Sequence, residues 1–143
     1  MNYTIIGDSV NLASRLENLD KFYDTNILIS SSTYDLVRDV FIARKLDFVA
    51  VKGRNEGLLI YELISKQSDT NSLENNFVHQ YELGLELYIK GSWNEALTAF
   101  DRARSLSPSG DDLPSSRMQE RCRIFLSEPP ASDWRGVYKF KDK

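Results

Sequence analysis

The chain has 143 residues, of which 41% are hydrophobic and 27% charged, and its formal net charge is −3 at pH 7. These values are typical of a globular protein that buries a core. Non-specific nucleic-acid binding needs a basic surface, so we expect no nucleic-acid partner. No apolar run approaches the roughly 20 residues of a membrane span, and the N-terminus lacks a signal-peptide pattern. We therefore expect no direct membrane insertion.

The chain contains one cysteine, Cys122, and one histidine. A single cysteine forms no internal disulfide, which makes a reducing cytoplasm the expected location. The histidine is too far from Cys122 in sequence to suggest a zinc site, so we predict no metal ligands from this chain. Cys122 is predicted to be a buried small hydrophobic residue.

The chain begins with the pattern of a strand followed by a helix. Tyr3–Ile6 is rich in β-branched and aromatic residues and predicts a short strand. Gly7 interrupts the strand, and Asp8 or Ser9 can cap a helix that starts near Val10. Apolar residues then recur at helical spacing, at Val10, Ala13, Leu16 and Leu19.

Two polar residues share one face of this predicted helix. Asn11 and Arg15 are four residues apart, so their side chains point the same way from the first turns. A helix N-terminus favours anionic ligands, and the planar guanidinium of Arg15 suits phosphate oxygens. Asn11 adds a neutral donor and acceptor. The alternative interpretation is a solvated helix face, and spacing alone favours it.

The middle of the chain predicts a strand, a helix and a β-hairpin. The predicted elements are a strand at 27–30, a helix from Ser31 to about Val40, and strands at 43–51 and 58–64 around a turn. Lys52 opens this turn beside Gly53, where a lysine can swing a point charge over a phosphate. A solvated turn lysine is the alternative.

The second half of the chain has a helical character. A polar linker is predicted at 66–73, a helical hairpin with a capping helix at 74–127, and an extended tail at 128–143. The expected helices are 73–90, 93–106 and 114–125, with Ser92 as the cap of the second. This part therefore predicts an all-α segment.

The run from Tyr3 to Glu17, YTIIGDSVNLASRLE, closely resembles the signature of class III adenylate and guanylate cyclases. The match continues in one register through NILIS at 26–30, LDFVAVKG at 46–53 and LLIYEL at 58–63. The resemblance implies an α+β fold. Residues 1–65 would form the C-terminal part of a cyclase-type, ferredoxin-like α/β sandwich, followed by the all-α helical hairpin.

The resemblance also implies a reaction and roles for residues. The complete enzyme would convert ATP (or GTP) to a cyclic nucleotide and pyrophosphate. Arg15 and Asn11 would be catalytic, while Thr4 and Lys52 would bind the substrate, with Thr4 favouring ATP. Two Mg²⁺ or Mn²⁺ ions would be held by aspartates of the earlier half of the domain, and the site would be shared with a second cyclase domain in a homodimer.

The chain therefore looks like the C-terminal fragment of a larger cyclase and is expected to be inactive alone. The resemblance leaves open a membrane-anchored parent protein.

The helical segment resembles one tetratricopeptide repeat. The residues that carry this resemblance are Leu83, Gly84, Ala96, Phe100, Ala103 and Pro108, while Gln80 stands where the pattern has tryptophan. A lone repeat must pack on something, and the candidate is the predicted capping helix at 114–125. A protein partner for the repeat is a further expectation. The alternative to a cyclase fragment is a non-catalytic interaction module with a degenerate cyclase scaffold.

Overall fold

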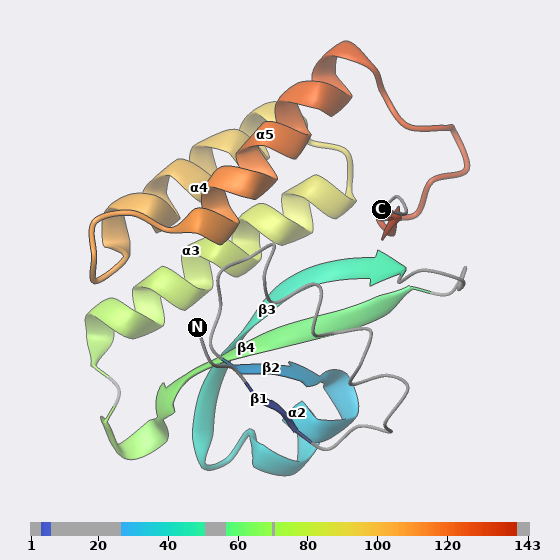
Figure 1. The fold of residues 1–143 in the computed structure, drawn as a ribbon. Coiled ribbons are helices and arrows are strands. Elements are labelled where there is room, and N and C mark those ends of the chain that lie inside the picture. Colours follow the sequence, from blue (N-terminus) through green and yellow to red (C-terminus); the bar gives the residue numbers. More distant parts are fainter. Residues whose placement is uncertain (1–3, 7–26, 51–56, 70, 140–143) are drawn as a thin grey trace. The chain divides into compact units, whose positions relative to one another are not determined.

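The computed structural model describes residues 4–6, 27–50, 57–69 and 71–139. The chain divides into two compact units: a sheet unit (residues 1–70 with 137–143) and a helical unit (71–136). The elements are β1 (Thr4–Ile6), β2 (Ile27–Ser30), α2 (Ser31–Val37), β3 (Phe41–Ala50), β4 (Leu58–Lys66), the 3-10 helix η1 (Gln67–Asp69), α3 (Ser72–Ile89), α4 (Trp93–Leu106), α5 (Leu113–Ser127) and β5 (Tyr138–Lys139) (Figure 1). The predicted α+β class is confirmed.

The sheet unit is built on a five-stranded sheet with the order β1-β2-β4-β3-β5. β1 runs parallel to β2, β4 runs antiparallel to both β2 and β3, and β5 runs parallel to β3. It follows that β1, β2 and β3 all point the same way. Their carboxyl ends lie at one edge of the sheet, and β4 begins at that same edge.

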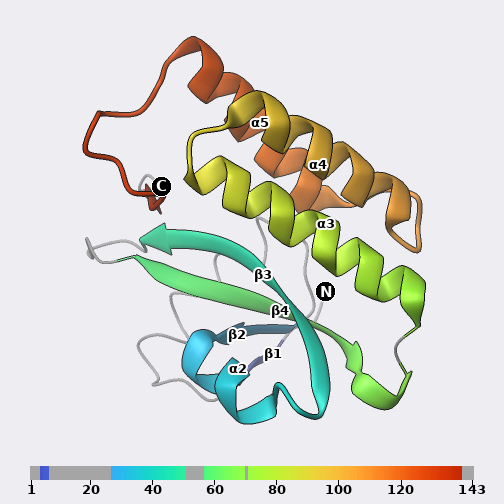
Figure 2. The ribbon, with the colours of Figure 1, turned by 180° about the vertical axis from the view of Figure 1, so that it is seen from behind.

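One face of this sheet is covered by α2, which lies beside β2 and β4 (Figure 2). The core between them consists of Ile29, Ala43 and Tyr61, with Tyr34 and Val37 of α2 packed against it. The rings of Tyr34 and Tyr61 stack at 4.3 Å between centroids. This apolar contact fixes α2 on the sheet.

The predicted helix at 31–40 is shorter than expected. It ends at Val37, and β3 begins at Phe41. The N-cap is Ser30, and its side chain accepts a hydrogen bond from the backbone N–H of Thr33. The predicted hairpin is confirmed, since β3 and β4 pair antiparallel from Phe41–Lys66 to Val49–Leu58.

The segment predicted as a linker at 66–73 has regular structure over most of its length. It contains the last residue of β4, the turn η1 and the first residues of α3. Gln67 links η1 to the residue before β3, because its backbone N–H donates to the Val40 carbonyl at 2.7 Å. The predicted domain boundaries stay a prediction.

The helical unit contains the three predicted helices. α4 has the predicted bounds, while α3 and α5 differ from theirs by one or two residues. Asn71 caps α3 in a reciprocal capping box with Glu74. Ser92 is the N-cap residue of α4, as predicted, although its side chain makes no capping hydrogen bond.

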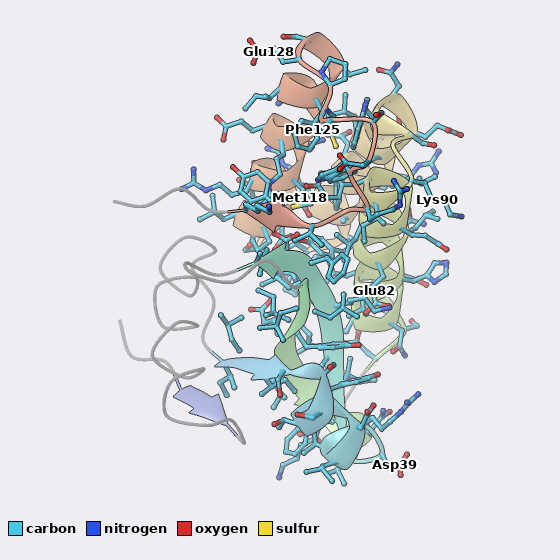
Figure 3. The ribbon with its side chains drawn as sticks, turned by 90° about the vertical axis from the view of Figure 1, so that its right-hand side faces the viewer. Asp39, Glu82, Lys90, Met118, Phe125 and Glu128 are labelled. Carbon is cyan, nitrogen blue, oxygen red and sulfur yellow. The ribbon has the colours of Figure 1, made fainter. Side chains whose placement is uncertain are left out.

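The core of the helical unit is aromatic. Phe100 and Tyr81 are fully buried and meet edge to face at 5.2 Å. A Cβ atom at Gly84 would lie 2.7 Å from Cε1 of Phe100, so a side chain is excluded where α3 approaches α4. Tyr88, Trp93, Phe125 and Trp134 form a second cluster, in which every centroid pair lies within 5.0–6.0 Å. Figure 3 labels Phe125 on α5.

Candidate functional site

The four predicted site residues belong to the sheet unit. Asn11, Arg15 and Lys52 lie outside the described residues. Thr4 is the first residue of β1, where its backbone pairs with Ile27 of β2. That these four side chains meet in one site therefore stays a prediction.

The sheet provides the framework on which these residues would be placed. Ile6 ends β1 and Ala50 ends β3, and both strands finish at the same edge of the sheet. The two strands are three positions apart in the strand order, which corresponds to about 14 Å at the usual spacing between strands. The strand ends that precede residues 7–26 and 51–56 therefore lie at one edge of the sheet.

Three hydroxyl groups lie at the same edge, where β2 passes into α2. The Ser30 Oγ atom lies 3.0 Å from the Ser32 Oγ and donates to the Thr33 Oγ1 at 3.3 Å. Ser30 and Thr33 are buried. Their hydrogen bonds are made to one another and to the backbone of α2, which gives them a capping role.

Buried charges in the middle of the sheet were missed by sequence reasoning. Arg44 of β3 directs both Nε and Nη2 at Oε1 of Glu62 on β4, at 2.8 Å each. Asp47 is fully buried, and its Oδ1 accepts the Phe48 backbone N–H at 2.7 Å. The pairing of β3 with β4 shifts register between Lys45 and Asp47. Such a bulge breaks strict alternation, so period-two reasoning could not assign these side chains to the interior.

The polar groups of the helical unit hold its helices together. Gln119 of α5 donates to the Leu97 carbonyl and accepts from Nη1 of Arg104, both at 3.1 Å. Arg104 also binds Asp111 at 2.9 Å, and this hydrogen bond lowers the pKa of the Asp111 carboxyl. These contacts join α4, α5 and the connection between them. These polar side chains therefore have a structural role in the helical unit.

Cys122 is fully buried on α5, as predicted. Burial raises the pKa of its thiol to about 11. The neutral thiol is a poor nucleophile, which confirms the interpretation of Cys122 as a core residue.

Neither a metal cluster nor a membrane span is found in the described part of the chain. Residues 4–6, 27–50, 57–69 and 71–139 contain no group of three or more histidine, cysteine, aspartate or glutamate side chains suited to a metal ion. Among the same residues, no helix is long and apolar enough to cross a bilayer.

The sequence is similar to several adenylate cyclases. It is 36% identical over 126 residues to the terminal-differentiation specific adenylate cyclase of Dictyostelium discoideum, a match that covers 85% of this chain. It is 38% identical over 74 residues to adenylate cyclase 1 of Rhizobium meliloti and 47% identical over 66 residues to an adenylate cyclase of Anabaena cylindrica, matches that cover 52% and 42% of this chain. No family model matches the chain.

These similarities support a cyclase domain. The chain spans only 6%, 11% and 12% of the lengths of these three relatives, in the order given. Among solved structures, the adenylyl cyclase CyaB of P. aeruginosa is 39% identical, and the match covers 46% of this chain and 33% of that one. The TM-score of this comparison is 0.35, which is too low to establish a shared fold.

Proposed function

We propose that the sheet unit supplies one wall of an adenylate cyclase active site, which converts ATP to cyclic AMP and pyrophosphate. The observation that carries the proposal is the similarity to three proteins named adenylate cyclase, with up to 47% identity. The shared sheet edge at the ends of β1 and β3 supports it, because both predicted phosphate-binding segments start there.

The proposed residues have distinct roles in this reaction. The ribose 3′-oxygen loses its proton and bonds to the α-phosphorus, while the bond from that phosphorus to pyrophosphate breaks. Negative charge grows on the phosphoryl oxygens, and Arg15 would stabilise it as a fixed bidentate donor. Asn11 would orient the ribose, Lys52 would bind the terminal phosphates, and Thr4 would hydrogen-bond the edge of adenine.

The proposal needs groups from outside this chain. Class III cyclases resemble this chain only in their closing part, and their Mg²⁺ or Mn²⁺ ions are held by aspartates of the earlier part. The described residues contain no cluster fitted to such an ion. A second cyclase domain would contribute the opposite wall, and the isolated chain is expected to form no cyclic AMP.

The helical unit has a place in the same proposal. The 126-residue match to the Dictyostelium protein is longer than the sheet unit, so it includes part of the helical unit. This co-occurrence favours a helical segment that accompanies a cyclase, over an independent interaction module. A tetratricopeptide-like role in binding a protein partner is part of the proposal.

The proposal can be tested in a chimera. The whole chain would replace the matched segment of the Anabaena adenylate cyclase, and formation of cyclic AMP from ATP would be measured with Mg²⁺ and with Mn²⁺. We expect turnover to persist and Arg15→Ala to reduce it by about 10²-fold or more, the scale of losing one transition-state donor. Arg38→Ala is the matched control, since the Arg38 side chain is 58% exposed at the end of α2. An Arg15→Ala chimera as active as its control would overturn the role of Arg15.

A further inference from the structure

The C-terminal strand β5 returns to the sheet unit after the whole helical unit. Tyr138 pairs with Val49, and Lys139 pairs with Ala50, in parallel register. Val49 and Ala50 are the last two residues of β3, so β5 covers that edge strand immediately before residues 51–56. β5 is thus placed at the loop end of the β3–β4 hairpin.

The residue before β5 packs at the other end of the same hairpin connection. A Cβ atom on Gly57 would lie 2.6 Å from Cγ2 of Val137 and 2.5 Å from Cζ of Phe48. The Phe48 ring and the Val137 side chain thus both occupy the space into which a side chain at position 57 would extend. Only glycine fits there without displacing one of them.

Both ends of the connection are thus held by one short segment. Residues 137–139, which we name the clasp, pair with the end of β3 and pack on Gly57 just before β4. The six residues between these two ends include Lys52. A lysine side chain has a limited length, so the position of its backbone restricts which phosphate oxygens the ammonium group can reach.

We propose that the clasp is a positioning element for the β3–β4 hairpin, which sets the affinity of the site for the triphosphate of ATP. This inference rests on the proposed function, from which it takes phosphate binding by Lys52. Val137 acts through the hairpin backbone and touches no substrate in this scheme. The clasp also gives the C-terminal segment a role in the sheet unit.

The structural part is tested by amide hydrogen exchange on the full chain. Val137→Ala removes the branched side chain whose Cγ2 atom lies beside Gly57, and a chain ending at Gly136 removes the clasp entirely. We expect amide exchange at Val49, Ala50 and Leu58 to become about tenfold or more faster in both variants. These amides lose the strand pairing and side-chain packing that residues 137–139 provide. Exchange at Ile29, in the core of the sheet, is expected to change little. Equal protection at Val49 and Leu58 in all three proteins would overturn the clasp.

The functional part is tested in a chimera that carries the whole chain in place of the matched Anabaena segment. We expect Val137→Ala to raise the KM for ATP by about tenfold with a smaller change in kcat, below the roughly 10²-fold that a 1 Å misplacement can cost. Val137→Ile should leave the KM for ATP at the value of the unsubstituted chimera, because it keeps a branched side chain at this position. Lys139→Ala is the control, since this side chain is exposed and its change leaves the backbone pairing intact.

The outcomes separate the two proposals. If Lys52→Ala raises the KM for ATP and Val137→Ala does not, the clasp has no positioning role and the proposed function stands. If Lys52→Ala leaves the KM unchanged, the phosphate-binding role of Lys52 is wrong and the positioning proposal falls with it. An inactive chimera counts against the proposed function, and unchanged hydrogen exchange then overturns the clasp as well.

Discussion

The sheet unit and the helical unit are stabilised by different kinds of contact. The helical unit buries large aromatic rings, with Tyr81, Tyr88 and Phe100 all fully buried. The sheet unit has a smaller apolar core under α2 and, in addition, a buried ion pair between Arg44 and Glu62. Apolar packing tolerates small shifts of position, whereas a buried ion pair depends on the register of two strands.

This difference explains why the buried positions follow from sequence periodicity in the helical unit but not throughout the sheet unit. Periodicity alone is enough to specify which face of a helix is buried, and α3 and α4 follow that rule. In the sheet unit, β3 departs from strict alternation at two register shifts. Substituting an aromatic core residue should therefore destabilise the helical unit, and substituting a charged core residue should destabilise the sheet unit.

The largest effect is expected for Phe100→Ala. Removing a fully buried ring should lower the free energy of unfolding by about 4 kcal/mol. Both tryptophans of the chain, Trp93 and Trp134, lie in the helical unit, so urea unfolding followed by tryptophan fluorescence reports on that unit. Ile124→Ala, at a position 51% exposed, is the control and should change stability by about 0.5 kcal/mol or less. Equal effects of the two substitutions would contradict an aromatic core.

Glu62→Ala should have the next largest effect, of about 3 kcal/mol, because the buried Arg44 guanidinium loses its carboxylate. The measurement is hydrogen exchange at Ile29 and Tyr61, which reports on the sheet unit. The pair Arg44→Met with Glu62→Leu removes both charges and should cost about 1 kcal/mol or less. If the double variant were as unstable as Glu62→Ala, lost packing rather than the lost ion pair would be the cause.

Asp112→Ala should lower stability by about 1 kcal/mol, the usual cost of losing an N-cap. The Asp112 carboxylate accepts from the Ser115 backbone N–H at 3.1 Å and from its hydroxyl at 2.7 Å, at the start of α5. Tryptophan fluorescence in urea again reports the change. The exposed pair of Glu86 and Lys90 is the comparison, and Glu86→Ala should have an effect near zero.

The smallest effect is a pH dependence from Cys122. Its pKa is raised from 9.0 to about 11 in the folded chain, so between these values the unfolded chain releases a proton that the folded chain retains. Stability should therefore fall as the pH rises from 9 to 11. Cys122→Ala should remove this part of the slope, whereas identical slopes for the two proteins would show that the thiol titrates alike in both states.

Much of the fold could be predicted from the sequence, because helices and hairpins are specified by neighbouring residues. The bounds of α4, the β3–β4 hairpin and the burial of Cys122 follow from periodicity and turn residues. The early end of α2 was missed because Phe41 suits both a helix face and a strand, and pairing with Lys66 decides between them. The return of β5 to β3 could not be predicted, since pairing between residues so far apart leaves no local pattern.

The candidate site was predicted in a different way. Arg15, Asn11, Thr4 and Lys52 were assigned by resemblance to cyclases, and spacing alone favoured a solvated face for the first two. The strand directions in the structure show, in addition, that β1 and β3 end at one edge of the sheet. The buried charges Arg44 and Asp47 carried no sequence signal, because their inward placement depends on a bulge.

The pairing of β5 with β3 has a consequence for how the chain is synthesised. β5 follows the entire helical unit in chain order, so β3 and β4 leave the ribosome long before their last neighbour exists. Translation proceeds at about 5–20 residues per second, and during that interval the end of β3 is exposed as an unpaired strand edge. The nascent sheet would be most vulnerable to mispairing in those seconds, and a translational pause within residues 71–136 would lengthen them.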